Sequence, residues 1–296
     1  MDTRFTAELP DQWQLRTVTL RLQRQPLVMG IVNVTPDSFS DGGRFLDPAY
    51  AVTHALELVE QGADILDIGG ESTRPYATPV SADEELRRVL PVIRQLGRQT
   101  RVPMSIDTIK ARVAREALDC GVEIINDVSG LEADPEMVPL AVATAAGVCV
   151  MHTQGTPATM QDNPCYENVV EEVRDYLQTR RSQLVEAGLD PARICVDPGI
   201  GFGKTHQHNL QLLSSCHRYL TLGAPLLVGP SRKGFLGHML QDKQADRQPA
   251  TIGVALSLAA QGVHILRVHD VGPVKQALQL FAATGGLGGD SPPPGA

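Results

Sequence analysis

The chain has 296 residues, a formal net charge of -8 and an isoelectric point near 5.5. This length suffices for a large buried core in one or two domains. The acidic balance argues against nucleic acid or an anionic membrane surface as a partner, because both require a basic face. An anionic substrate would therefore have to be met by a local cluster of positive groups.

The cysteines and the first residues indicate the compartment. Five cysteines occur with no C-x-x-C pair, and Cys149 and Cys195 lie inside apolar runs. We interpret the five as reduced thiols and not as zinc ligands or disulfide partners. The first thirty residues lack the apolar region of a signal peptide, and the longest apolar stretch, Val138 to Met151, is too short to span a bilayer. We therefore expect a cytoplasmic protein.

Both ends of the chain differ from its middle. Residues 1–26 contain a weak alternation of polar and apolar residues that is typical of a short hairpin. We expect this extension to close the bottom of a barrel. Residues 285–296 are rich in glycine and proline and cannot build a core, so we expect a flexible tail. Residues 27–284 form the main predicted domain.

From Val28 onward, short apolar runs alternate with amphipathic helical patterns. The runs that we interpret as strands are Val28–Val32, Asp64–Ile68, Pro103–Ile106, Glu123–Ile125, Val148–Met151, Arg193–Val196, Leu226–Val228 and His264–Val268. Helical patterns between them include Ala49–Gln61, Ala82–Gln99, Ala111–Cys120, Pro135–Ala146, Glu167–Ala187 and Thr251–Gln261. Eight such units predict an α/β protein with a single parallel (β/α)₈ TIM barrel. A doubly wound open sheet is the alternative, but no G-x-G-x-x-G follows the first strand.

All eight predicted strands lead into polar residues, and the carboxyl ends of parallel barrel strands meet at one mouth. These residues are Asn33, Asp67 with Glu71, Asp107, Asn126, His152, Asp197, Ser231 with Lys233, and Arg267 with His269. Any one of them alone could be a satisfied polar group of the core. Asp197, for example, precedes Pro198 and Gly199 and could simply cap a turn. Eight such ends together indicate a functional site.

The strand-end residues divide by chemistry. One group, helped by Lys233, offers donors and acceptors suited to the edge of a nitrogen heterocycle: Asp107, Asn126 and Asp197. A second group offers neutral ligands and positive charge suited to a phosphate with Mg²⁺, a hard cation that takes oxygen ligands. It consists of Asn33, Thr73, Arg74, Arg267 and His269. We expect the heterocycle deep in the mouth and the phosphate nearer the rim.

Two loops are too polar and too glycine-rich for simple connectors. Thr35–Gly43 and Gly69–Pro75 follow early strands, and Phe39 between serines indicates a lid, although a plain connector is the alternative. The turn Gly229–Gly234 should open a short helix whose backbone N–H groups bind a carboxylate or phosphate. The hydroxyl of Ser231 would add a donor there.

Seven segments together resemble dihydropteroate synthase. They are Asn33–Gly43, Asp67–Pro75, Ser105–Thr108, Ile125–Asp127, Asp197–Lys204, Ser231–Lys233 and Arg267–Asp270. The resemblance extends from about Val28 to Leu280. It implies a folate-pathway transferase that joins (7,8-dihydropterin-6-yl)methyl diphosphate to 4-aminobenzoate, with diphosphate as the second product.

The resemblance also implies roles by position. The residues implied on the pterin are Asp107, Asn126, Asp197 and Lys233, with Met151 against its ring. The implied diphosphate contacts are Thr73, Arg74, Arg267 and His269, and Asn33 is the implied Mg²⁺ ligand. The residues implied around the aminobenzoate are Phe39, Pro75, Phe202, Ser231 and Arg232; Pro36, Phe39 and Pro75 lie in the two closing loops. Among all these, Asp107, Asp197 and Lys233 are the implied catalytic residues.

The implied mechanism is a substitution with early C–O cleavage, in which buried acids stabilise positive charge on the pterin and cationic groups stabilise the leaving diphosphate. A homodimer and inhibition by sulfonamides are implied as well. Tyr76 and Ala77 depart from the family, which often has glycine after the Arg-Pro pair. Nothing is inserted after Pro75, where drug-insensitive relatives carry extra residues.

Two rival functions remain at this point. A pterin-binding methyltransferase barrel would share the pterin acids but would not need the anion sites around Ser231 and Arg267. A non-catalytic paralogue would be expected to have lost Asn33, Asp107 or Lys233, and all three are present.

Overall fold

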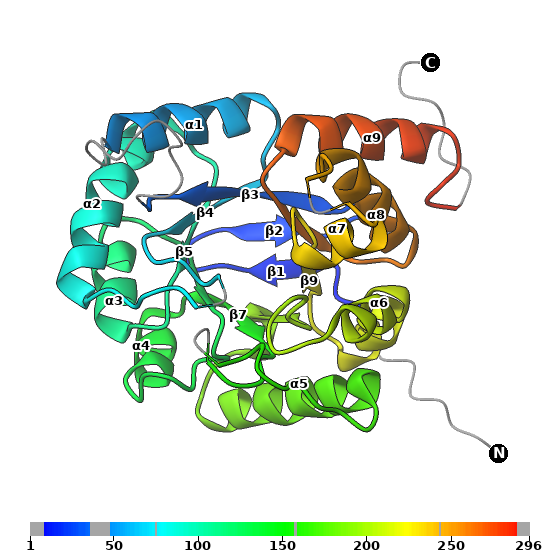
Figure 1. The fold of residues 1–296 in the computed structure, drawn as a ribbon. Coiled ribbons are helices and arrows are strands. Elements are labelled where there is room, and N and C mark those ends of the chain that lie inside the picture. The colour runs from blue at the N-terminus through cyan, green and yellow to red at the C-terminus, as the bar shows by residue number, and fades with distance from the viewer. Residues whose placement is uncertain (1–8, 36–47, 75, 157–158, 243, 289–296) are drawn as a thin grey trace.

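Eight parallel strands form a closed barrel in the computed structural model, which describes residues 9–35, 48–74, 76–156, 159–242 and 244–288 (Figure 1). The strands are β3 (Leu27–Asn33), β4 (Ile65–Gly69), β5 (Met104–Asp107), β6 (Ile124–Asp127), β7 (Gly147–Met151), β8 (Ile194–Asp197), β9 (Leu227–Val228) and β10 (Ile265–Val268). They pair in the order β8-β7-β6-β5-β4-β3-β10-β9. A parallel bridge between Val196 and Leu226 joins the two ends of this order. The predicted TIM barrel is therefore confirmed, and the open sheet is not.

Helices surround the barrel and bury one side each against it (Figure 1). They are α1 (Pro48–Glu60), α2 (Ala82–Gln99), α3 (Ala111–Asp119), α4 (Met137–Thr144), α5 (Val169–Glu186), α6 (His206–Ser214), α7 (Gly234–Met239), α8 (Gln248–Ala260) and α9 (Val271–Ala283), with 3₁₀ turns at Pro191–Arg193 and Cys216–Leu222. Polar side chains set several helix starts. Ser81 accepts a hydrogen bond from the N–H of Glu84 at the start of α2, and three acidic residues in the first turn favour the helix dipole.

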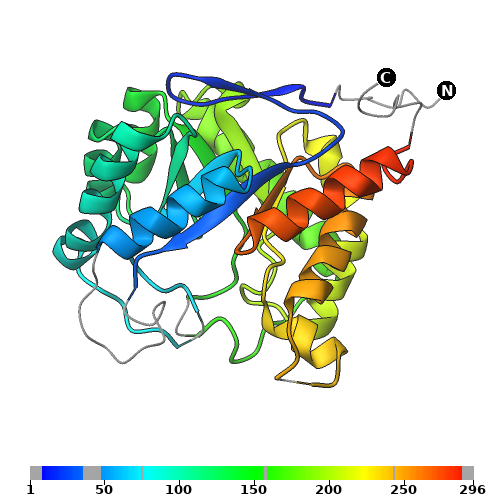
Figure 2. The same cartoon turned by 90° about the horizontal axis from the view of Figure 1, so that it is seen from above.

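The N-terminal hairpin closes one end of the barrel, as predicted. Its strands are β1 (Gln12–Gln14) and β2 (Thr19–Arg21), paired antiparallel. Trp13 is fully buried, and its Nε1 donates a hydrogen bond to the carbonyl oxygen of Arg193 at 2.9 Å. Figure 2 shows the blue hairpin across one end of the barrel, with β3 running away from it.

Beneath the hairpin lies an apolar layer inside the barrel. It consists of Trp13, Leu15, Met29, Ile65, Ile124, Cys149, Cys195, Leu227 and Ile265. Most of these are inward residues near the amino ends of the strands. The layer seals the end of the barrel opposite to the strands' carboxyl ends.

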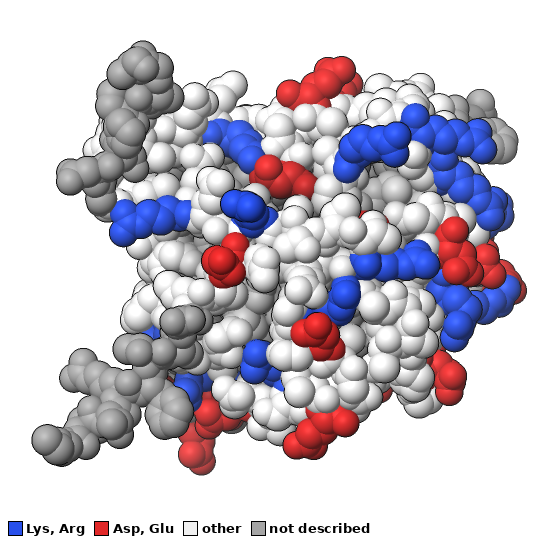
Figure 3. All heavy atoms as spheres, turned by 180° about the vertical axis from the view of Figure 1, so that it is seen from behind, with Lys and Arg blue, Asp and Glu red and all other residues white. Residues whose placement is uncertain are grey.

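The cysteines are free thiols, and Cys149, Cys195 and Cys216 are buried. In the described part of the chain, no helix combines the length and apolarity needed to cross a membrane. On the face seen in Figure 3, acidic and basic side chains are interspersed among uncharged ones.

We predict that Trp13→Ala destabilises the protein by about 3–5 kcal/mol, because it leaves a cavity in the closed end and an unpaired carbonyl at Arg193. The free energy of unfolding from denaturant titration measures this. Val18→Ala in the same hairpin is the control; Val18 is 44% exposed, so its loss should cost about 0.5 kcal/mol or less. Equal losses for the two variants would contradict the role of Trp13.

Candidate active site

A cavity of about 1440 Å³ opens at the carboxyl ends of the strands, where the polar strand ends were predicted to converge. The predicted site residues in its wall are Asn33, Thr73, Arg74, Asp107, Phe202, Ser231, Arg232, Lys233, Arg267 and His269. Three more, Asn126, Met151 and Asp197, are buried at the ends of β6, β7 and β8. Pro36, Phe39 and Pro75 lie outside the described residues, so the predicted lid remains a prediction.

Arg267 on β10 joins the acids of the cavity into one network. Its Nε donates to Asp67 Oδ2 at 2.6 Å, and its Nη2 donates to Asp107 Oδ2 at 2.7 Å. Asn126 Nδ2 donates to the same Oδ2 of Asp67 at 3.1 Å. The network therefore connects β10, β4, β5 and β6. Arg267 was predicted to bind a phosphate near the rim, whereas its guanidinium contacts Asp107, a residue predicted to bind the heterocycle.

Asp67 is the member of this network that sequence reasoning left undecided. Its side chain is fully buried, and Oδ1 has no hydrogen-bond partner among the described residues. The inward direction of Asp67 could have been predicted from the residue alternation in β4, because inward residues of a strand recur at every second position. Ile65 belongs to the apolar layer, so Asp67 two residues later faces the same interior, one layer nearer the mouth.

Burial favours the uncharged form of Asp107 and of Lys233 and shifts the pKa of each accordingly. It raises the pKa of Asp107 to about 7, although the Arg267 charge works against this rise. It likewise lowers the pKa of Lys233 to about 8, opposed by the carboxylate of Asp197. For Arg267, burial disfavours the charge, but Asp67 and Asp107 outweigh it and raise its pKa. The guanidinium therefore stays charged while Asp107 titrates near neutral pH.

The loop after β8 folds tightly around the end of its strand. Asp197 Oδ1 accepts the N–H of Gly199 at 2.7 Å, so the carboxylate does cap a turn, with its other oxygen left for further contacts. Gly199 has φ +69°, and a Cβ there would collide with the carbonyl oxygen of His152. Lys233 reaches this loop by donating to the carbonyl of Ile200, and its Nζ lies 4.8 Å from the ring centroid of Phe202.

His152 has a structural environment. Its Nδ1 lies 3.0 Å from Nζ of Lys204, which also donates to the carbonyl of Phe202 at 2.8 Å. Burial lowers the pKa of His152 to about 3, so the imidazole is neutral at pH 7. His152 could be a functional residue or a satisfied polar group of the core, and these contacts agree with the second interpretation. The sequence did not indicate the partnership with Lys204.

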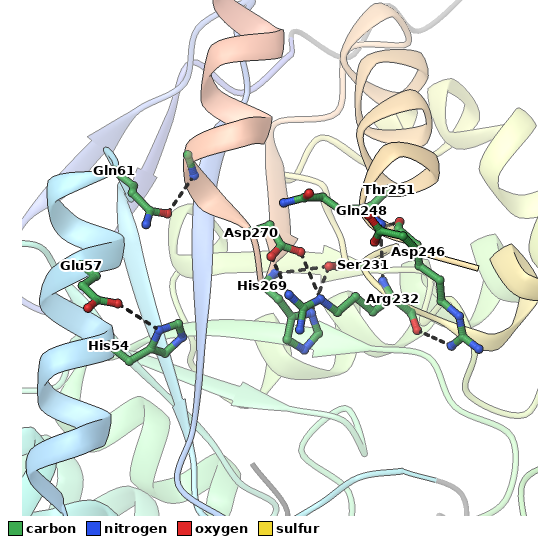
Figure 4. A network of polar contacts seen from close by, with 12 residues as sticks. His54, Glu57, Gln61, Ser231, Arg232, Asp246, Gln248, Thr251, His269 and Asp270 are labelled. Atoms are coloured by element: carbon green, nitrogen blue, oxygen red, sulfur yellow. Dashed lines mark hydrogen bonds and ion pairs between the residues drawn. The ribbon is translucent and has the colours of Figure 1, made fainter. Parts of the chain in front are cut away.

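Two pairs of side chains hold the wall formed by β10 and the loop after β9 (Figure 4). Ser231 Oγ lies 3.0 Å from His269 Nδ1 and accepts the backbone N–H of His269 at 3.2 Å. Arg232 forms two hydrogen bonds with Asp270, at 3.0 and 2.5 Å. Burial and the neighbouring cations lower the pKa of His269 to about 3, so it acts as a neutral group. The predicted short helix is present as α7, but it begins at Gly234, three residues after Ser231.

Tyr76, where the sequence departs from the family's usual glycine, has φ +63°. This left-handed conformation favours glycine and is strained for a bulky side chain. The hydroxyl of Tyr76 donates to Asp162 Oδ1 at 3.1 Å, which anchors the residue to the loop after β7.

The cavity wall combines Asp107 with cationic and neutral groups, while Asp67, Asp197 and the amide of Asn126 are buried at the neighbouring strand ends. Carboxylates and an amide in a water-poor setting can bind a flat molecule rich in N–H groups, because each unpaired polar group there would be costly. Arginine, threonine and histidine side chains in the same wall can bind an anion. The arrangement therefore suits a heterocyclic substrate that carries a negatively charged group.

Known proteins are similar to this chain in sequence and in fold. The family model described as pterin binding enzyme matches residues 29–269. Dihydropteroate synthase of Haemophilus influenzae is 44% identical over 259 residues, which cover 88% of this chain and 94% of the relative. That of Neisseria meningitidis serogroup C is 44% identical over 277 residues, with 92% and 97% covered.

Solved structures of dihydropteroate synthases are similar to this chain in fold. Yersinia pestis dihydropteroate synthase with a sulfonamide drug has a TM-score of 0.87 and 41% identity, covering 92% of this chain and 98% of that one. The Xanthomonas albilineans enzyme in complex with 7,8-dihydropteroate has a TM-score of 0.83 and 40% identity, with the same coverage. The chain belongs to the dihydropteroate synthase family of pterin-binding enzymes.

Proposed function

We infer that the protein condenses (7,8-dihydropterin-6-yl)methyl diphosphate with 4-aminobenzoate to give 7,8-dihydropteroate and diphosphate, in folate biosynthesis. The observation that carries this function is a cavity whose wall holds Asp107, Lys233 and Arg267, with Arg267 paired to Asp107 and to the buried Asp67. The related Xanthomonas albilineans enzyme has been solved with 4-aminobenzoic acid and with 7,8-dihydropteroate, which supports the same substrate and product here.

The pterin is proposed to bind at the inner end of the cavity. Asp107 and Asp197 supply carboxylate oxygens for the N–H groups of the pterin edge, and Lys233 donates to an acceptor beside Asp197. Asn126 is held by Asp67 through its amide nitrogen, which leaves its oxygen as an acceptor. Met151, whose exposed fraction is 4%, pairs with Asp197 between β7 and β8, and we propose that it packs against the pterin ring.

The diphosphate is proposed to bind where Thr73, Arg74 and His269 line the wall. Arg74 is exposed and long enough to follow the anion, and His269 is neutral, so it offers a hydrogen bond without needing a proton from solution. Arg267 lies between this group and the acids. Its position allows it to contact both halves of the substrate.

The aminobenzoate is proposed to bind beside Phe202, Ser231 and Arg232. The Arg232 side chain is 53% exposed and is already oriented by Asp270. Ser231 is buried and directed toward His269. These contacts preorganise a cationic and a hydroxyl group for a carboxylate, which reduces the entropy lost on binding.

Mg²⁺ is proposed to bind with the diphosphate. Among the described residues no cluster of three His, Cys, Asp or Glu side chains could hold a metal alone. Asn33 supplies one oxygen at the cavity wall, and Mg²⁺ commonly takes its other ligands from substrate phosphates and water. These residues therefore suit a metal that arrives with its substrate. When bound, Mg²⁺ would neutralise charge on the leaving diphosphate.

In the proposed reaction, the bond between the pterin methylene carbon and the diphosphate oxygen breaks early. Asp107 and Asp197 stabilise the positive charge that develops on the pterin, while Arg74 and Arg267 stabilise the negative charge on the departing oxygen. The amine of 4-aminobenzoate attacks the methylene carbon and then loses a proton. An arylammonium is acidic enough to need no strong base.

We further propose a cytoplasmic homodimer that contacts through the late helices. The free thiols agree with a reducing compartment. Leu280 on α9 is 68% exposed, and α9 packs beside α8, so an apolar group is available on that side. Sedimentation equilibrium distinguishes a dimer from a monomer.

Lys233→Ala and Asp197→Asn are expected to abolish turnover without unfolding the barrel, because each removes a charged group at the inner end of the cavity. The measurement is diphosphate release in a coupled assay that requires both substrates and Mg²⁺, with circular dichroism to verify folding. Near-normal rates in either folded variant would contradict the assignments.

The pH dependence of kcat/KM should be bell-shaped. Asp107, with a pKa of about 7, must lose its proton to pair fully with Arg267, so activity rises through pH 7. Lys233, with a pKa of about 8, loses its charge above that value, so activity then falls. Lys233→Arg keeps its charge and should lose the falling limb in its remaining activity. An unchanged falling limb in that variant would assign it to another group.

Sulfonamides are expected to inhibit by competing with 4-aminobenzoate, since both present an aniline ring and the Yersinia pestis relative has been solved with such a drug. Steady-state inhibition at several aminobenzoate concentrations tests this. The apparent inhibition constant should rise in proportion to aminobenzoate. Failure to compete even at high drug concentration would refute the prediction.

A further inference from the structure

A partly buried ionic cluster of Glu71, Glu85 and Lys110 adjoins the segment that carries Thr73 and Arg74. Glu85, in the first turn of α2, has a fully buried side chain, and its Oε2 accepts from Lys110 Nζ at 2.6 Å. The same Nζ also donates to Oε2 of Glu71. Lys110 is the N-cap residue of α3, so one ammonium group joins α2, α3 and the segment after β4.

Glu71 connects this cluster to the segment 71–80. Its second oxygen, Oε1, accepts the N–H of Val80 at 3.1 Å. The two ends of the segment are therefore tied together, with Thr73 and Arg74 between them. Glu71 itself also lies in the wall of the cavity.

The chain enters the segment along a constrained path. A Cβ at Gly70 would lie 2.8 Å from Val89 Cγ1 and 3.0 Å from Glu85 Cγ, so only glycine can pass this close to α2. Arg88 Nη1 donates to the carbonyl of Gly70 at 2.8 Å. This path places the side chain of Glu71 within hydrogen-bond distance of Lys110.

We propose that Lys110, anchored by Glu85, is a positioning residue that holds Glu71 and thereby places Thr73 and Arg74 for the diphosphate of the substrate. This inference rests on the proposed function. Lys110 also balances the charge of Glu71, since an unpaired carboxylate in that wall would repel the diphosphate.

A purely structural role explains the cluster less well. Burying charges is expensive, and well-packed apolar residues often replace buried ion pairs without loss of stability. The same two helices are also joined by an exposed ion pair, Arg112 Nη2 to Asp83 Oδ1 at 2.7 Å. Unlike the exposed pair, the cluster around Lys110 also connects these helices to Glu71.

The test is a double-mutant cycle between Lys110→Met and Arg74→Ala, read in the KM for the pterin diphosphate. Each single change should raise this KM roughly tenfold, because each loses the positioned guanidinium. The double variant should resemble Arg74→Ala alone, because Lys110 acts through Arg74. Lys110→Arg should restore part of the loss. The matched control is Arg112→Met, which removes the exposed pair between the same helices and should leave KM unchanged.

The outcomes separate the two claims. An unchanged KM in Arg74→Ala would overturn the diphosphate assignment and the inference that rests on it. A raised KM in Arg74→Ala with additive effects in the double variant, or with an unchanged KM in Lys110→Met, would overturn the role of Lys110 alone. Glu71→Gln replaces Lys110→Met if the latter does not fold. It keeps an acceptor for Val80 but loses the ion pair, and the same results are expected from it.

Discussion

The placement of one guanidinium between two acids is the constraint on which the site depends. Arg267 donates from separate nitrogens to Asp67 and Asp107, and Asp67 in turn orients Asn126. A planar group with several fixed N–H directions can do this, whereas a lysine offers one point charge. Removing the arginine would leave the carboxyl groups of Asp67 and Asp107 without this partner in a water-poor interior, which is costly. Groups from four strands are thus held in one geometry by a single side chain.

The closed end of the barrel contributes to the chemistry at the open end. The apolar layer beneath the hairpin excludes water from below, so the polar layer above it is solvated from one side only. This partial solvation explains why burial is the largest cause of the shifted pKa values of Asp107 and Lys233. In such surroundings fixed charges act strongly on a developing charge, because little solvent rearranges to screen them.

Sequence reasoning predicted the eight strands and the polar strand-end residues of the cavity wall, because alternation and strand-end polarity are local properties. The first strand, predicted as Val28–Val32, spans Leu27–Asn33. Contacts between distant residues could not be predicted in this way. The sequence around Arg267 does not indicate that it pairs with Asp67, and the sequence around Lys204 does not indicate its contact with His152. Such pairings follow from the register of the closed barrel, and the sequence contains only the residues that make them possible.

The network around Arg267 also bears on how the chain reaches its native state. The hydrogen bonds from this residue join positions separated by 200 and 160 residues. Until β10 has docked between β3 and β9, Asp67 and Asp107 lack the guanidinium that pairs with both of them. The barrel therefore cannot close before this strand is in place. Contacts of such long sequence separation are slow to form, which makes the docking of the final strand a natural late event in folding.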